Sequence, residues 1–226
     1  MKRALLTGAT AAMLALPGAA SAKVVELGST VPAGQVSCPT NCQALSRVTG
    51  YQSRAGVLRD PFLIPRAGKI VAFTVRLGAP TAEQMRFFQA DLQLGQPSVQ
   101  MSVLRRDTRR RTRNEHRLLA QSDPFPVKDH LGSAPTFVLD KPIQVSRRSI
   151  VALTTPTWAP ALSVGLKRDH LWRASRPKGR CDNVSQRAQQ VRLMSVKIFG
   201  CTYFTARLYY TVTYIPDNRP TAKTQS

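Results

Sequence analysis

Seven arginines lie between residues 105 and 117 and form a dense cluster of positively charged side chains. Only Asp107 and Glu115 oppose them. Guanidinium groups bind phosphate and carboxylate through charge and paired hydrogen bonds, and no aromatic residue among them could stack on a base. The cluster therefore predicts salt-sensitive binding to anionic polymers, without sequence-specific recognition of nucleic acid. A solvated basic loop is the alternative. The seven residues are Arg105, Arg106, Arg109, Arg110, Arg111, Arg113 and Arg117.

A second candidate surface centres on Trp172, which is followed by Arg173 and Arg176. An exposed indole ring can stack on a sugar ring, whereas a buried one packs in the core. Core packing is the favoured role of both tryptophans, above all of Trp158, but Trp172 is the better candidate for a stacking surface. Exposure of Trp172 in a concave surface would favour a carbohydrate-binding module over an interaction domain.

The sequence contains few residues or motifs that are typical of a catalytic site. No G-x-S-x-G turn is present, and the carboxylates mostly lie beside arginine or lysine or in turns, where they pair or cap. We therefore expect no catalytic residues, although the carboxylates of a glycan hydrolase can come from distant strands. His116, His130 and His170 lack metal-ligand spacing, and solvated loop positions are expected for them. A structural calcium site would use Asp123, Asp129 and Asp140, but no D-x-D-x-D-G loop is present. We expect neither metal nor cofactor.

The four cysteines allow three disulfide pairings. Cys38 and Cys42 can close a tight local loop, and Cys181 and Cys201 bracket a polar segment, so the sequential pairing is favoured. A zinc site is the alternative, but it would need further ligands. An even cysteine count fits an oxidising compartment outside the cytoplasm.

The first 22 residues resemble a secretory signal peptide in their organisation. Lys2 and Arg3 precede an apolar run from Ala4 to Leu16, and Ala20-Ser21-Ala22 forms a small-residue cleavage site. We expect a secreted or extracytoplasmic protein that begins at Lys23 and has no transmembrane segment. The 33 basic and 12 acidic residues give a net charge of +21, which favours anionic partners; a solubilising surface is the alternative.

The elements that position these residues are predicted to be strands. Alternation from Thr202 to Ile215 predicts one long strand with a buried and a solvated face. Residues 105–117 are predicted to form the tip of an antiparallel hairpin, and Thr81 and Gln84 form a capping box before a short helix at 82–90. Asp140-Lys141-Pro142 predicts a turn, and residues 185–190 could form one helical turn. Other strands are expected at 46–52, 70–77, 99–103, 136–139, 143–145, 149–153, 161–166, 171–174 and 193–199.

Together these elements predict an all-β protein, an antiparallel, jelly-roll-like β-sandwich with one short helix. The expected organisation is a signal peptide at 1–22, a lead-in with the small cysteine loop at 23–45, a single sandwich domain at 46–216 and a polar tail at 217–226.

Several sequence islands resemble exported β-sandwich proteins of soil actinobacteria. The islands are Arg47-Val-Thr-Gly-Tyr-Gln52, Thr157-Trp-Ala-Pro-Ala161, Trp172-Arg-Ala-Ser-Arg176, Gly200-Cys201 and Arg207-Leu-Tyr-Tyr-Thr211. The resemblance implies a signal peptide, a jelly-roll-like sandwich and a disulfide in the region of Cys181 and Cys201. It implies no activity, ligand or catalytic residue.

The sequence thus leads to an exported, non-enzymatic β-sandwich that binds carbohydrate or anionic cell-envelope polymers. A structural or protein-interaction domain without a small-molecule site is the alternative, and a glycan-active hydrolase is a distant third.

Overall fold

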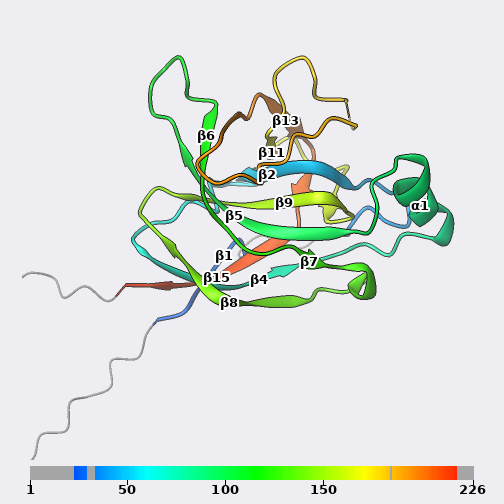
Figure 1. Ribbon diagram of the computed structural model, residues 1–226, viewed down its shortest axis with the longest axis horizontal. Coiled ribbons are helices and arrows are strands. Elements are labelled where there is room, and N and C mark those ends of the chain that lie inside the picture. Colours follow the sequence, from blue (N-terminus) through cyan, green and yellow to red (C-terminus); the bar gives the residue numbers. More distant parts are fainter. Residues whose placement is uncertain (1–22, 30–33, 184, 218–226) are drawn as a thin grey trace, which may run out of the picture.

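The computed structural model describes residues 23–29, 34–183 and 185–217 and shows two main layers of antiparallel strands (Figure 1). The predicted signal peptide and almost all of the polar tail lie outside these residues. One layer is a nine-stranded sheet in the order β12 (Val196–Ile198), β6 (Glu115–Gln121), β5 (Ser98–Arg106), β9 (Ile150–Ala159), β2 (Leu45–Ala55), β11 (His170–Ala174) and β13 (Cys201–Phe204), with β3 (Leu58–Arg59) on β2 and β7 (Phe125–Pro126) on β5.

The second layer is a four-stranded sheet in the order β1 (Val25–Leu27), β15 (Tyr210–Pro216), β4 (Gly68–Val75) and β8 (Thr136–Val145). A short pair, β10 (Leu162–Ser163) and β14 (Arg207–Leu208), completes the strands. Strand β1 lies within the predicted lead-in and pairs with β15. These layers confirm the predicted all-β, sandwich-like fold, whereas a jelly-roll order of connections stays a prediction.

The core lies between the two layers. On β15, Tyr210, Val212 and Tyr214 are buried, and the residues between them are partly exposed. Alternating strand residues point to opposite faces, so this strand places its aromatic and branched residues against the opposite sheet. The Tyr210 ring stacks on Phe62 with the centroids 4.0 Å apart, and its hydroxyl donates to the Val151 carbonyl on β9 at 2.9 Å.

The prediction of one continuous strand from Thr202 to Ile215 is wrong, because the chain changes sheets within it. The segment divides into β13, β14 and β15, and Thr205 adopts a left-handed backbone with φ of 55°. Strand β13 pairs with β11 in the nine-stranded sheet, while β15 pairs with β4 in the other. The alternation of buried and partly exposed residues holds only along β15, because Arg207 and Tyr209, predicted to face solvent, are buried as well.

Of three further local predictions, two are wrong and one is confirmed. Asp140-Lys141-Pro142 forms no turn between separate strands, because β8 continues through it with a shift in its register on β4. Residues 185–190, all of which the structure describes, do not form the predicted helical turn. The capping box is confirmed: the Gln84 amide donates to Thr81 Oγ1 at 3.3 Å, and the Thr81 amide donates to Gln84 Oε1 at 2.9 Å.

The capped helix is α1 (Ala82–Arg86), and it continues as a π-helical turn, η1 (Phe87–Asp91). Phe88 of this turn is buried and stacks on Trp158, with the centroids 4.6 Å apart. Trp158 is fully buried, and its Nε1 donates to the Gly95 carbonyl at 2.8 Å. Its predicted role in the core is therefore confirmed.

Both predicted disulfides are present, Cys38–Cys42 and Cys181–Cys201. The second ties the loop after β11 to the start of β13 across a sequence separation of 20 residues. Closing a loop of this size stabilises a fold by roughly 3 kcal/mol on a chain-entropy estimate. Within the described ranges, no helix is long and apolar enough to cross a membrane.

Candidate functional site

The predicted basic hairpin is confirmed, with β5 and β6 as its strands. Arg105 lies opposite Arg117 and Arg106 opposite His116, and the Asp107 amide donates to the Glu115 carbonyl at 2.9 Å. Within the tip, the Glu115 amide donates to the Thr112 carbonyl at 2.7 Å. These bonds hold the tip as an ordered turn at one end of the molecule (Figure 1).

Three of the seven arginines anchor the base of the hairpin. Arg106 is half-buried, where its Nη2 donates to Tyr51 Oη at 3.0 Å and lies 3.7 Å from Asp60. Arg105 donates to the Ser146 hydroxyl, and Arg117 donates to the Met194 carbonyl at 3.0 Å. Each of these guanidinium groups is therefore tied to a neighbouring segment.

The other four arginines, Arg109, Arg110, Arg111 and Arg113, are exposed on the tip. Arg109 pairs with Asp107 at 2.6 Å, and its hydrogen bonds hold the pKa of that carboxyl well below its usual range. Among the described residues, no carboxylate lies within ion-pair distance of the remaining three. The tip therefore presents uncompensated positive charge to solvent.

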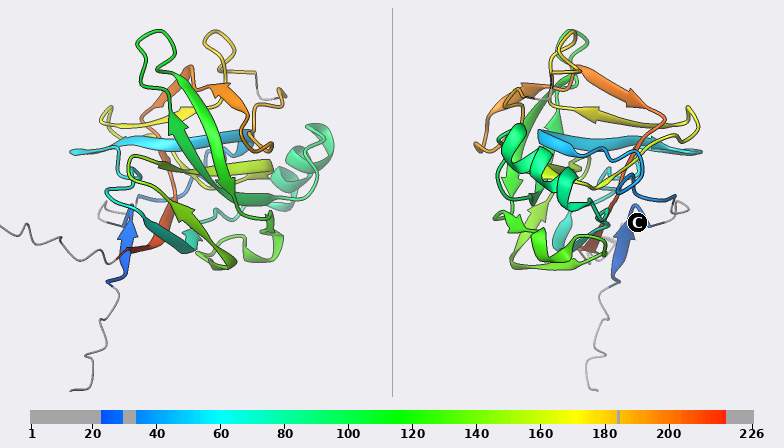
Figure 2. Two further views of the ribbon diagram at one scale, coloured as in Figure 1. Left: turned by 60° about the vertical axis from the view of Figure 1, so that its left-hand side comes forward. Right: turned by 90° about the vertical axis from the view of Figure 1, so that its right-hand side faces the viewer.

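Later parts of the chain enlarge this positive surface. The loop at 177–183 and the hairpin tip lie at the same end of the molecule in both views of Figure 2. The segment 186–199 first passes β2, where the Ala188 amide donates to the Arg47 carbonyl at 2.9 Å. It then runs beside β6, where the Met194 amide donates to the Leu118 carbonyl at 2.8 Å and the Phe199 amide donates to the Asn114 carbonyl at 2.7 Å. We call this region the basic end. Its exposed cations are Arg109, Arg110, Arg111, Arg113, Arg117, Lys178, Arg180, Arg187 and Arg192, opposed by Asp107, Glu115 and Asp182.

The sequence cluster contained only the hairpin part of this surface. Arg187 and Arg192 are separated from the hairpin by about seventy residues. Their distance in sequence gave no sign of this proximity, which depends on the pairing of β12 with β6.

His116 lies beneath the hairpin and is fully buried, so the predicted solvated position is wrong for this histidine. Its Nδ1 lies 3.0 Å from the Asn114 carbonyl and must donate to it, which leaves Nε2 to accept from the Tyr51 hydroxyl at 3.1 Å. Burial lowers the His116 pKa to about 3, and the nearby positive charge of Arg106 acts in the same direction. His116 is therefore neutral at physiological pH and adds no charge to the basic end.

Trp172 does not form the candidate stacking surface, and the core packing favoured for it from the sequence is confirmed. Trp172 is only 3% exposed, because it packs into the core and Tyr203 covers it, with the two ring centroids 4.4 Å apart. Arg173 Nη2 donates to Asn114 Oδ1 at 2.9 Å and to the Phe199 carbonyl at 2.7 Å. Arg173 therefore joins β11 to the hairpin at Asn114 and to the segment before β13 at Phe199.

Arg176 is also buried, with 5% of its surface exposed. Its guanidinium group donates to the Ser46 carbonyl at 3.1 Å, to the Cys181 carbonyl at 3.1 Å and to the Tyr203 hydroxyl at 2.8 Å. The candidate Trp172, Arg173 and Arg176 surface is thus a set of structural contacts.

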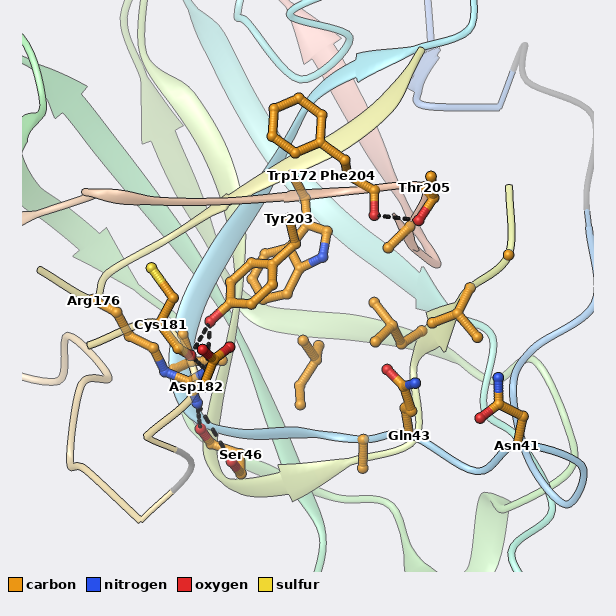
Figure 3. A pocket seen from close by; sticks show the side chains of 17 residues that line it. Asn41, Gln43, Ser46, Trp172, Arg176, Cys181, Asp182, Tyr203, Phe204 and Thr205 are labelled. Atoms are coloured by element: carbon orange, nitrogen blue, oxygen red, sulfur yellow. Dashed lines mark hydrogen bonds between the residues drawn. The ribbon is translucent and has the colours of Figure 1, made fainter. Parts of the chain in front are cut away.

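Beside this set lies a pocket with a volume of about 450 Å³ (Figure 3). Tyr203, Phe204 and Thr205 form one wall, and Asn41 and Gln43 reach it from the opposite side. Leu45, Val48, Leu162 and Val164 supply an apolar floor. Trp172 Nε1 and Arg176 Nε lack a hydrogen-bond partner in the described parts of the chain. The pocket thus combines an aromatic wall, two amides and two unpaired donors beneath its surface.

The other two histidines lie in separate parts of the described chain. His170 Nε2 lies 3.9 Å from its neighbour Asp169, and His130 is exposed. Within the described ranges, no three histidine, cysteine, aspartate or glutamate side chains gather as metal ligands, so Asp123, Asp129 and Asp140 form no such cluster.

Comparison of the chain with models of known protein families, with curated proteins and with solved structures gave no match. The functional proposal therefore depends on the chemistry of the basic end and the pocket.

Proposed function

We propose that this protein is an exported, non-enzymatic binding module for anionic cell-envelope polymers, and that the hairpin tip is its principal contact. The observation that carries the proposal is the exposure of Arg110, Arg111 and Arg113 without a carboxylate partner in the described structure. The two disulfides support a place outside the cytoplasm.

The way the hairpin is anchored supports a binding role. Arg105, Arg106 and Arg117 hold its base, so the tip cations are presented together on an ordered turn. Like charges held close together repel one another, and a polyanion relieves this repulsion by replacing the counterions between them. The same charges would also raise the rate of encounter with an anionic polymer.

Neutralising the tip should weaken binding to polyanions and reduce its dependence on salt. In the variant Arg109→Gln/Arg110→Gln/Arg111→Gln/Arg113→Gln, the slope of log affinity against log salt on duplex DNA should fall by up to about 0.9 for each lost phosphate contact. Binding to heparin should weaken in parallel. Titrations of both polymers at several salt concentrations measure the effect.

A matched control removes the same charge from other exposed positions: Arg59, Arg66, Arg86 and Arg147. This control has the net charge of the tip variant, so it separates a local site from a general charge effect. Equal binding by the wild type and the tip variant at every salt concentration would reject the hairpin as the contact.

A second candidate function is the binding of a neutral saccharide in the pocket. It is favoured by the Tyr203 wall and the two facing amides, since sugars combine an apolar ring face with hydroxyl groups. A protein-interaction domain without a small-molecule site is the alternative to both proposals.

The variant Gln43→Leu tests the pocket, because it removes an amide from the rim while leaving the backbone contacts of Gln43 with Ser37 in place. We expect calorimetric affinity for a bound saccharide to fall about tenfold, as for the loss of one hydrogen bond whose partner stays unpaired. Gln144→Leu, at an exposed position on β8, is the control. Absence of saccharide binding at millimolar concentration by the wild type would exclude this function for the sugars tested.

A further inference from the structure

The basic end also carries a concentration of exposed apolar side chains. Eleven large apolar residues of the described chain are exposed, and five of them fall between residues 191 and 198, with 44% to 58% of their surface accessible. Single exposed apolar residues are ordinary on protein surfaces, but such a run marks an interaction site. The five are Val191, Leu193, Met194, Val196 and Ile198, and we call them the apolar segment.

The apolar segment lies on the outer side of the nine-stranded sheet. Strand β12 is the end strand of that sheet and pairs only with β6 among the described strands. Val196 and Ile198 share one face of β12, because alternate residues of a strand point the same way. Lys197 lies between them, and its ammonium group donates to the Arg187 carbonyl at 3.2 Å. The strand therefore presents its apolar face away from its own lysine.

Two arginines lie beside these apolar side chains. Arg192 lies within the segment, and Arg117 lies opposite Val196 in the pairing of β6 with β12 and donates to the Met194 carbonyl. Ile198 lies opposite Glu115, the first residue of β6, where the hairpin tip ends. Arg192 and Arg117 thus lie next to exposed apolar side chains of the apolar segment.

We propose that the basic end has a second partner besides the anionic polymers, an anionic lipid surface, into which the apolar segment inserts while the arginines bind the lipid phosphates. This inference rests on the proposed function, because it uses the same arginines. A hydrated polymer would attract the arginines electrostatically but would leave the apolar side chains in water. An anionic bilayer stabilises both groups: its phosphates attract the arginines, and the apolar side chains enter the boundary between head groups and acyl chains.

The test compares the binding of three proteins to vesicles of phosphatidylcholine with and without phosphatidylglycerol. The first is the wild type, which should bind the anionic vesicles much more strongly than the neutral ones. The second is Val191→Ser/Leu193→Ser/Met194→Ser, whose changes precede β12 and leave its pairing with β6 intact. We expect this variant to lose about 100-fold in vesicle affinity, from roughly fivefold for each half-exposed side chain, and to keep its heparin affinity.

The third protein is Val57→Ser/Val138→Ser, a control that removes exposed apolar side chains elsewhere on the surface. It should bind vesicles as the wild type does. The tip variant with four glutamines should lose both vesicle and heparin binding, by about fivefold on vesicles for each arginine that contacts the anionic surface.

The outcomes separate the two proposals. Equal vesicle binding by the wild type and the apolar variant would overturn the lipid inference and leave the polymer proposal standing. A concentration-dependent dimer that the apolar variant abolishes, without vesicle binding, would overturn it in favour of a second copy as the partner. Failure of the wild type to bind either heparin or anionic vesicles would overturn both proposals.

Discussion

Acidification from pH 7 to pH 4 is expected to lower the free energy of unfolding by about 3 kcal/mol through His116 alone. His116 has an ordinary pKa of 6.5 in the unfolded chain and a pKa lowered to about 3 in the fold. Below pH 6.5 the unfolded chain therefore binds a proton that the folded protein does not. The stability due to the neutral imidazole is fully present above pH 6.5 and is lost as the pH falls towards 3.

The geometry around His116 explains why the folded protein resists this proton. A protonated ring would carry a second N–H at Nε2, and Arg106 Nε, itself a donor, lies 3.4 Å from that atom. The imidazolium would also be buried beside a guanidinium group, where desolvation and repulsion act together. Asp107 has a pKa below its ordinary value of 3.8, so its effect on stability is lost only at lower pH.

Urea unfolding at pH values from 7 to 4 measures how steeply the free energy of unfolding changes with pH. The variant His116→Phe should be less stable at pH 7, because Tyr51 and Arg106 lose a buried partner, but most of its pH dependence in this range should be gone. His130→Gln, which removes an exposed histidine, should retain the wild-type slope. A wild-type slope in His116→Phe would show that another group governs acid unfolding.

Replacing Arg176 by alanine is expected to cost about 3 kcal/mol or more of stability. The buried guanidinium group is the shared donor to the Ser46 and Cys181 carbonyls and the Tyr203 hydroxyl. Its removal takes a charged donor from each of these acceptors, although the Cys181 carbonyl still accepts from the Tyr203 hydroxyl at 2.5 Å. A hydrogen bond to a charged group contributes about 1.5–3 kcal/mol. The removal also opens space beneath the Trp172 and Tyr203 pair, next to the pocket.

Denaturant unfolding of Arg176→Ala and Arg180→Ala tests this role. Arg180 lies in the exposed loop after Arg176, so its truncation should change stability by less than about 0.5 kcal/mol. Arg176→Lys should fall between the wild type and Arg176→Ala, since lysine retains the charge but cannot reach the three acceptors in one plane. A loss below about 1 kcal/mol in Arg176→Ala would mean that water entering from the pocket replaces the guanidinium group.

Much of the architecture was determined by local sequence signals. The alternation on β15, the capping box at Thr81 and the charged turn between β5 and β6 each follow from residues close together in the chain. The sequential disulfides were favoured for the same reason, since a short loop and a bracketed polar segment bring their cysteines together. Local patterns of this kind depend on strand periodicity and turn chemistry, which neighbouring residues set by themselves.

The tertiary structure decided which of the candidate residues face solvent. Alternation alone could not show that the chain changes sheets at Thr205, because both sheets face one core. It also could not show that Tyr203 covers Trp172 or that His116 is buried. The neighbours responsible come from strands distant in sequence, so burial there depends on long-range pairing.

The basic end depends both on local sequence and on the tertiary structure. Its arginine cluster at 105–117 is a property of the sequence, because the charges are adjacent in the chain. Its apolar segment became part of the same surface only through the pairing of β12 with β6, which joins residues some eighty positions apart. Strand pairing between distant segments follows from the packing of the whole sheet, and no local pattern in residues 191–198 specifies that partner.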